Sequence, residues 1–271
     1  MSSAHSDYSI PLPEMCPKCG NMNLLQKGFG TEKIQEVLKE LLPEKQIGRF
    51  DRDEIKNITQ LEKTLDDFEC GEIDVLVGTQ MLSKGHNFKR VNLVVVLGVD
   101  SQMNFPDFRA IEKTYQLLTQ ITGRSGRFSK EANVIVQSLS PESHIFSYIK
   151  DHSFEDFYLE ELKLREMTKL PPYTKIAMIH FHSRFREKVL EESCEAKDYL
   201  VKVNSFNKLE VEVLGPVPAM IEKKVGQYTW SIMLKSVEIK HLHLVMENFS
   251  RKFNIGSGVK FRIDIDPYFC F

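Results

Sequence analysis

Two arginines beside glycines carry the most specific chemical signal in the sequence. They belong to the segment Gln120-Ile121-Thr122-Gly123-Arg124-Ser125-Gly126-Arg127, in which each arginine directly follows a glycine. Two guanidinium groups three residues apart can present two donor forks from one loop, and such forks stabilise a phosphoryl group during its transfer. A solvated basic turn, with the glycines ending a helix, is the alternative that this segment leaves open by itself.

A second polar segment follows a buried strand predicted at Ile73–Val77. Because α/β proteins bind ligands at the carboxyl ends of their strands, Thr79 and Gln80 are suited to hold a phosphate backbone through hydroxyl and amide groups. Lys84 and His86 would add charge or hydrogen bonds. The alternative is a plain strand-to-helix connection with Gly85 as its C-cap. The segment in full contains Gly78, Thr79, Gln80, Lys84, Gly85, His86 and Asn87.

A Cys-x-x-Cys pair near the start of the chain has the spacing of half a zinc site. A structural zinc ion takes four ligands, and Cys16 and Cys19 supply two, with no second pair of this spacing in the sequence. Two ordinary surface cysteines are the alternative. The total of five cysteines is odd, which indicates a reducing compartment, and we expect Cys70, Cys194 and Cys270 to be inert.

The first part of the chain alternates short apolar runs with amphipathic helical segments. This order is typical of βαβ units around a parallel sheet covered by helices on both faces. The fold class predicted here is therefore α/β. The helices are expected at Thr31–Leu42, Ile58–Phe68 and Arg109–Gln120, and the strands at Ile47–Phe50, Ile73–Val77, Leu93–Leu97 and Val134–Val136.

A second, smaller domain is predicted after a proline pair. The charged segment Tyr148–Met167 has helical periodicity, and Leu170-Pro171-Pro172 must end it. Beyond this boundary the order β-α-β-β-α-β predicts a ferredoxin-like α+β domain. Its elements are expected at Ile176–His182, Glu187–Val203, Leu209–Leu214, Tyr228–Leu234, Ile239–Phe253 and Val259–Ile265.

Composition excludes several classes of protein. The 271 residues are 42% hydrophobic and 27% charged, and no apolar run approaches the roughly 20 residues of a membrane-spanning helix. The start of the chain has neither a basic n-region nor an apolar h-region, so a cytoplasmic location is expected. A net charge of −2 provides no basic excess of the kind that usually marks nucleic-acid binders.

The polar segments together resemble motifs V and VI of superfamily 2 helicases. Six blocks in the same order are similar to the bacterial replication-restart helicases of the PriA (primosomal protein N′) family, from about Cys16 to the end of the chain. The blocks are Gly30-Thr31-Glu32, Arg49-Phe50-Asp51-Arg52-Asp53, Gly78 to His86, Pro106-Asp107-Phe108-Arg109-Ala110, Gly123 to Arg127 and Gly215-Pro216-Val217-Pro218-Ala219.

The resemblance implies a domain order. Residues 1–25 would be the remnant of a zinc-binding insertion that contains Cys16 and Cys19. Residues 26–170 would be the second RecA-like helicase lobe, and residues 171–271 a C-terminal α+β domain. In the family a first lobe carries the phosphate-binding Gly-x-x-x-x-Gly-Lys loop. None of the 14 glycines here precedes a lysine, so we expect ATP and Mg²⁺ to be bound mainly by a lobe that this chain lacks.

The resemblance also implies roles for single residues. Gln120, Arg124 and Arg127 would face ATP, and either arginine would supply transition-state charge. Gly85, Asn87 and Gly123 would lie towards the nucleotide, although many superfamily 2 helicases have aspartate in place of Asn87. DNA contacts would come from Gly78, Thr79, Gln80, Lys84 and His86.

Three further segments have a structural alternative beside the functional one. Asp51-Arg52-Asp53 resembles the motif IV region but also fits a solvated turn with local ion pairs. Asp107 to Arg109 is expected to cap the following helix. Gly215 to Ala219, with Lys223, Lys224, Tyr228 and Trp230, fits a basic, aromatic loop for branched DNA, or else a β-hairpin loop with a core tryptophan.

Two functions of different class follow from the sequence. In the first, the chain is the second half of an ATP-driven 3′→5′ DNA helicase that restarts replication, binds forked or single-stranded DNA, and interacts with single-strand-binding protein and other primosome proteins. On this hypothesis the chain alone is inactive. In the second, it is a non-catalytic nucleic-acid or protein-binding module with a RecA-like shell.

Overall fold

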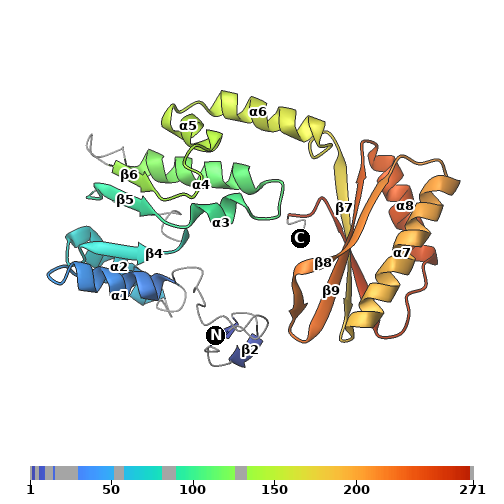
Figure 1. The fold of residues 1–271 in the computed structure, drawn as a ribbon, viewed down its shortest axis with the longest axis horizontal. Helices are drawn as coiled ribbons and strands as arrows, with labels where there is room; N and C mark the ends of the chain where they lie inside the picture. Colours follow the sequence, from blue (N-terminus) through green and yellow to red (C-terminus); the bar gives the residue numbers. More distant parts are fainter. Residues whose placement is uncertain are drawn as a thin grey trace. The chain divides into compact units, whose positions relative to one another are not determined.

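The computed structural model describes residues 2–3, 6–9, 15, 30–51, 58–80, 90–125 and 133–268. The chain divides into two compact units (Figure 1). The parallel unit contains Pro13–Phe105 and Arg109–Ser153. The antiparallel unit contains Met1–Leu12, Pro106–Phe108 and Phe154–Phe271.

The parallel unit contains two pairs of parallel strands. Strand β3 pairs with β4 from Ile47↔Val75 to Phe50↔Gly78, and β5 pairs with β6 from Leu93↔Asn133 to Val96↔Val136. The strands are β3 (Ile47–Phe50), β4 (Val75–Gly78), β5 (Leu93–Val96) and β6 (Asn133–Val136). The helices are α1 (Thr31–Leu41), α2 (Ile58–Cys70), α3 (Val99–Met103), α4 (Ala110–Ser125) and α5 (His144–Lys150).

Helices pack on both strand pairs of this unit. Helices α1 and α2 contact β3, and α4 contacts β5 and β6, while α3 and α5 pack against α4. The apolar faces of these helices follow the i, i+3, i+4 spacing that the sequence shows, so the alternation of strand and helix is as predicted. Leu118 and Tyr115 of α4 are buried in this packing.

The sheet is smaller than the sequence predicts. The described strands form two separate pairs, where a single parallel sheet covered on both faces was expected. Alternate residues of β5 and β6 remain open to solvent: Leu93 is 51% exposed, Val95 50% and Ile135 54%. The apolar run Leu93–Leu97 is therefore shielded on one face and exposed on the other.

The antiparallel unit contains a four-stranded sheet with the strand order β10-β7-β9-β8, in which all neighbours are antiparallel. Its elements follow the β-α-β-β-α-β order that the sequence predicts. They are β7 (Lys175–Ser183), α7 (Arg186–Phe206), β8 (Glu212–Lys224), β9 (Gln227–Ser236), α8 (Ile239–Lys252) and β10 (Val259–Ile265), and α6 (Phe154–Met167) precedes them.

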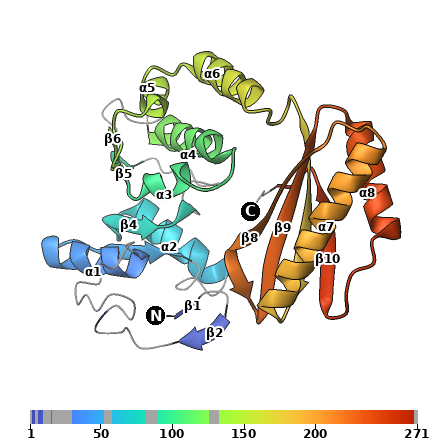
Figure 2. The same cartoon turned by 45° about the vertical axis from the view of Figure 1, so that its right-hand side comes forward.

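Helices α7 and α8 pack together and contact the sheet (Figure 2). Ala177, Ile179 and Phe181 of β7 belong to one buried cluster with residues of both helices, such as Leu200 and Phe249. Because side chains alternate along a strand, the residues between them lie on the opposite face of the sheet, where Ile176 and Met178 are also buried.

Two predicted elements end elsewhere in the structure. The helix expected over Tyr148–Met167 is split into α5 and α6 by residues 151–153, and His152 has a positive φ of 53° there, which a continuous helix does not allow. Strand β8 continues through Gly215–Ala219, which is paired with β9 across register shifts instead of forming a loop.

Candidate nucleotide and DNA interface

The end of β4 presents three of the residues predicted to contact DNA. Gly78 is the last residue of the strand and pairs with Phe50, and Thr79 and Gln80 follow it as exposed residues. The amide Nε2 of Gln80 donates a hydrogen bond of 2.9 Å to Oε1 of Gln102. The predicted position of this segment, at the carboxyl end of a parallel strand, is confirmed, and its polar groups are accessible.

The short helix α3 carries Gln102 and is held in place by Asp100. Oδ1 of Asp100 accepts hydrogen bonds from the Ser138 hydroxyl at 2.8 Å and from the Leu139 amide at 3.0 Å, which ties α3 to the segment after β6. The Ser138 hydrogen bond lowers the pKa of Asp100, so the carboxylate stays ionised. Sequence reasoning missed both Asp100 and Gln102; the only signal was Gly98 directly after an apolar strand.

Asp51, at the end of β3, is buried rather than solvated. Its carboxylate accepts a hydrogen bond from the Thr31 hydroxyl and forms an ion pair with Nε of Arg49 at 3.2 Å. Arg49 also lies 3.8 Å from Glu32. This network joins the first turn of α1 to the end of β3. The solvated-turn interpretation is therefore wrong for Asp51, while Arg52 and Asp53 lie outside the described residues.

Helix α4 ends in the glycine-arginine segment, as the sequence predicts. Gln120 is half-buried in its last turns, and Gly123 is exposed, with open space around the position that a Cβ would occupy. Backbone at Gly123 is thus accessible to a ligand. The backbone of Arg124 is helical, and its side chain lies outside the described part of the structure.

The remaining predicted site residues lie outside the described residues, so their roles stay predictions. They are Lys84, Gly85, His86, Asn87, Arg127, Cys16 and Cys19. Asp107 is buried three residues before α4 begins, and its predicted capping role likewise stays a prediction.

Neither a metal cluster nor a membrane span is found in the described part of the chain. Within those residues, no three His, Cys, Asp or Glu side chains lie close enough together to hold a metal ion. Of the helices described there, none combines the length and the apolar character needed to cross a bilayer.

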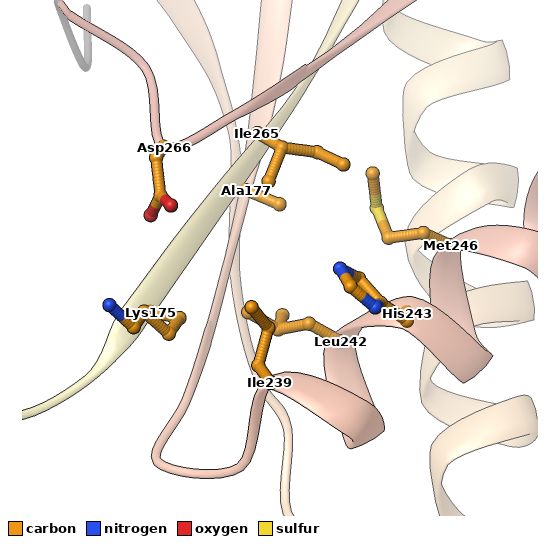
Figure 3. A pocket seen from close by; sticks show the side chains of 8 residues that line it. All are labelled: Lys175, Ala177, Ile239, Leu242, His243, Met246, Ile265 and Asp266. Atoms are coloured by element: carbon orange, nitrogen blue, oxygen red, sulfur yellow. The ribbon is translucent and has the colours of Figure 1, made fainter.

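A small hollow in the antiparallel unit lies between α8 and the ends of β7 and β10 (Figure 3). Its apolar floor includes Ala177, Leu242 and Met246, and Lys175 and Asp266 stand together at one side. The predicted site residues do not line this hollow. Its lining is mainly apolar, with Lys175, His243 and Asp266 as the polar members.

The parallel unit matches a helicase domain by sequence. The family model of the helicase conserved C-terminal domain matches residues 28–129, which include Thr79, Gln80, Gln120 and Gly123. The class defined by this match and by the polar strand and helix ends is therefore that of a C-terminal helicase domain.

A second family model and several curated relatives identify the particular family. The model of the primosomal protein N C-terminal domain matches residues 166–268. Replication restart protein PriA of Haemophilus influenzae is 35% identical over 266 residues, 97% of this chain and 36% of the relative. PriA of Synechocystis is 35% identical over 94% of this chain, and PriA of Bacillus subtilis 32% over 96%. The chain belongs to the PriA family and corresponds to its C-terminal part.

The chain spans about a third of the length of these relatives: 36% of the Haemophilus influenzae protein, 30% of the Synechocystis protein and 32% of the Bacillus subtilis protein. Among solved structures, the de novo designed protein Foldit4 has a TM-score of 0.28 at 12% identity, covering 35% of this chain and 97% of its own. That likeness is too low to carry an argument.

Proposed function

We propose that the chain forms the second motor lobe and the C-terminal domain of an ATP-dependent 3′→5′ DNA helicase. This helicase would bind stalled or branched forks and restart replication by primosome assembly. The observation that supports this most directly is the glycine-arginine segment at the end of α4, inside the residues that match the helicase C-terminal domain.

At the nucleotide, the chain contributes charge rather than the phosphate-binding loop. Arg124 or Arg127 neutralises the negative charge that develops on the transferring phosphoryl group, and Gln120 orients groups beside it. Gly85, Asn87 and Gly123 lie towards the nucleotide. ATP and Mg²⁺ are held mainly by a first lobe, because this sequence contains no Gly-Lys step from which a phosphate-binding loop is built.

At the DNA, the end of β4 binds the phosphate backbone. The exposed Thr79 hydroxyl and Gln80 amide donate to phosphate oxygens, and backbone at Gly78 approaches closely. Gln102 holds the Gln80 amide through the 2.9 Å hydrogen bond and so acts as a positioning residue. Lys84 and His86 extend the same surface. Contacts of this kind fix register and carry no sequence preference, which suits a motor.

In fold, the parallel unit is a RecA-like lobe, and the antiparallel unit is a ferredoxin-like domain. The β-α-β-β-α-β order, the strand order β10-β7-β9-β8 and the packing of α7 and α8 support the second assignment. In the hairpin of β8 and β9, which we propose as a further DNA contact, the Lys223 ammonium lies 4.9 Å from the Tyr228 ring centre.

The partners proposed are forked or single-stranded DNA, single-strand-binding protein and other primosome proteins, in the cytoplasm. Cys16 and Cys19 would provide two of four ligands of a structural zinc. The alternative function, a non-catalytic binding module, is favoured only by the lack of a Gly-Lys step in this sequence.

ATP hydrolysis tests the proposal. We expect the pure chain to show no DNA-stimulated ATPase activity, and a mixture with a separately purified first lobe of a PriA relative to gain it. Robust turnover by the chain alone would overturn the split site. A mixture that stays inactive while the chain binds DNA would favour the binding module. A Thr79→Ala/Gln80→Ala variant should weaken DNA binding, with the exposed Thr168→Ala as its matched control.

A further inference from the structure

Helix α3 carries a carboxylate two residues from the side chain that holds Gln80. Asp100 is the second residue of α3, and its side chain is partly buried. The hydrogen bond from Ser138 lowers the pKa of this carboxylate, so it is ionised at neutral pH. Because a negative charge weakens the binding of a nearby phosphate, an acid beside a proposed DNA contact calls for a role other than attraction.

Asp100 accepts two hydrogen bonds from the segment that follows β6. Its Oδ1 atom lies 2.8 Å from the Ser138 hydroxyl oxygen and 3.0 Å from the Leu139 amide nitrogen. The Ser138 oxygen accepts a further hydrogen bond, of 3.0 Å, from the Ser140 amide. We call the two hydrogen bonds to Asp100 the α3 latch. Both end on one oxygen atom, so the latch requires an acceptor at Oδ1 and does not require a negative charge.

The α3 latch fixes a helix that is too short to be stable alone. Its five residues make little more than one turn, and an isolated helix of this length does not persist in water. Val99 at its start is buried, and α3 packs against α4. The latch adds a connection to the segment directly after β6, the strand that pairs with β5. The position of α3 therefore depends on α4 and on the β5–β6 pair.

The other end of α3 reaches the second strand pair. Oε1 of Gln102 accepts the 2.9 Å hydrogen bond from Nε2 of Gln80, which lies just after β4. Among the described strands, β3 and β4 form one pair and β5 and β6 another, with no strand pairing between them. Helix α3 thus bridges the two pairs through polar contacts. An amide nitrogen has two hydrogens, so Nε2 of Gln80 is able to donate both to Gln102 and to a phosphate oxygen.

We propose that Asp100 is a positioning residue for the DNA contact at the end of β4. Its Oδ1 atom holds α3, α3 carries Gln102, and Gln102 orients the Gln80 amide towards a backbone phosphate. A side chain that is already oriented loses less rotamer freedom on binding, so its contact is worth more. This inference rests on the proposed function, because it requires the end of β4 to bind DNA.

Two simpler roles for Asp100 predict different results. If the carboxylate only repelled DNA, removal of its charge would tighten binding whichever residue replaced it. If it only stabilised the parallel unit, its loss would lower the free energy of unfolding and leave the DNA affinity of the folded chain unchanged. Positioning through Oδ1 predicts that alanine and asparagine differ, because only asparagine retains an oxygen acceptor at that place.

Fluorescence anisotropy of the full chain with a labelled oligothymidine at neutral pH tests the proposal. The loss of affinity in Thr79→Ala/Gln80→Ala measures what the end of β4 contributes. Asp100→Ala should weaken binding roughly threefold to tenfold, the range of one hydrogen bond. Asp100→Asn should bind at least as tightly as the wild-type chain. In a Gln80→Ala background, Asp100→Ala should weaken binding no further, since the contact that it positions is already lost.

Asp74→Ala is the matched control. Asp74 is an exposed aspartate of the same unit that also accepts a backbone hydrogen bond, of 2.8 Å from the Gln46 amide. It directly precedes β4, at the opposite end of the strand from Gln80. Its replacement should not weaken DNA binding. Circular dichroism should show that each variant is folded.

Ser138→Ala removes one of the two donors of the α3 latch and tests the same role if Asp100→Ala does not fold. It should weaken binding by less than Asp100→Ala. If Thr79→Ala/Gln80→Ala weakens binding while Asp100→Ala and Ser138→Ala do not, or if Asp100→Asn weakens it as much as Asp100→Ala, the positioning role is wrong and the DNA contact stands. If Thr79→Ala/Gln80→Ala leaves the affinity unchanged, the DNA contact itself is overturned, and the inference with it.

Discussion

The two units of this chain differ in how completely each buries its own apolar surface. In the antiparallel unit, Phe181, Phe249 and Leu234 are inaccessible to solvent. Of the largest fully buried side chains among the described residues, only Phe50 and Leu118 belong to the parallel unit. The parallel unit also leaves Leu93 and Val95 about half exposed.

The unit with the denser core is not the unit proposed for motor chemistry. The residues proposed for ATP and the backbone of DNA lie at strand and helix ends of the parallel unit, where little apolar surface is buried. The antiparallel unit has a dense core. On the proposed function, another lobe completes the site of the parallel unit, so this unit can leave apolar surface open in the chain described here.

The largest effect is expected for ATP turnover when one arginine of the parallel unit is replaced. In a protein that joins this chain to a first motor lobe, Arg127→Ala should lower DNA-stimulated ATP turnover roughly 10³-fold, because transition-state charge is no longer neutralised. Steady-state ATPase assays measure this. Arg124→Ala provides the comparison that shows which arginine dominates, and turnover that barely changes in both variants would contradict the arginine assignment.

Core truncation should affect the two units unequally. Phe249 stacks on Phe253 at 4.8 Å and meets Phe261 at 5.1 Å, so Phe249→Ala should cost about 3–5 kcal/mol of unfolding free energy. Leu93→Ala should cost below about 1 kcal/mol, because half of that side chain is already exposed. Urea denaturation followed by circular dichroism compares them, and equal losses would refute the contrast.

Replacing the buried carboxylate of Asp51 in the parallel unit should lower the free energy of unfolding by less than truncating the aromatic core does. Asp51→Asn keeps the shape but removes the charge that faces Arg49, so we expect a loss of about 1.5–3 kcal/mol. Asp74→Asn is the matched control. Asp74 is exposed and paired with Lys45 at 3.0 Å, and its loss should be much smaller. Chemical denaturation at neutral pH distinguishes the two; a larger loss for Asp74→Asn would contradict the burial argument.

The smallest effect expected is a pH dependence of stability in the antiparallel unit. The pKa values of His180 and His182 are lowered on folding, chiefly by burial, so below about pH 6.5 the unfolded chain binds more protons. Stability should therefore fall as the pH falls through this range. His180→Gln/His182→Gln should flatten the decline in urea midpoint, and His243→Gln should not. An unchanged decline in the double variant would contradict the assignment.

The order of helices and strands was predictable wherever a single hydrophobic periodicity dominates a segment of the sequence. Thr31 begins α1 and Pro43 follows its end, as the capping-compatible threonine, the proline and the apolar spacing indicate. The β-α-β-β-α-β order was read from alternation alone. The split between α5 and α6 was not predictable, because helical periodicity continues across residues 151–153 although His152 has a positive φ.

The site was predictable at the level of segments and not of partners. The sequence located Thr79, Gln80 and Gly123 at strand and helix ends. It did not indicate that Gln102 holds Gln80, since the two residues belong to different elements and meet only in the fold. The hydrogen bonds of His180 and His182 were not predictable for the same reason: their hydroxyl partners are supplied by β9, about 50 residues later in the chain.

Gly215 lies where β8 contacts β9, and this position has no space for a larger side chain. Its φ is 98°, and a Cβ on this residue would lie 2.8 Å from the carbonyl oxygen of Ser231. The hydroxyl of that same serine holds the His180 ring. We therefore expect that Gly215→Ala on β8 would displace Ser231 of β9 and, through its hydroxyl, the His180 ring on β7, two strands away. For this sheet, the backbone spacing between β8 and β9 therefore limits which substitutions the polar side chains of β7 tolerate.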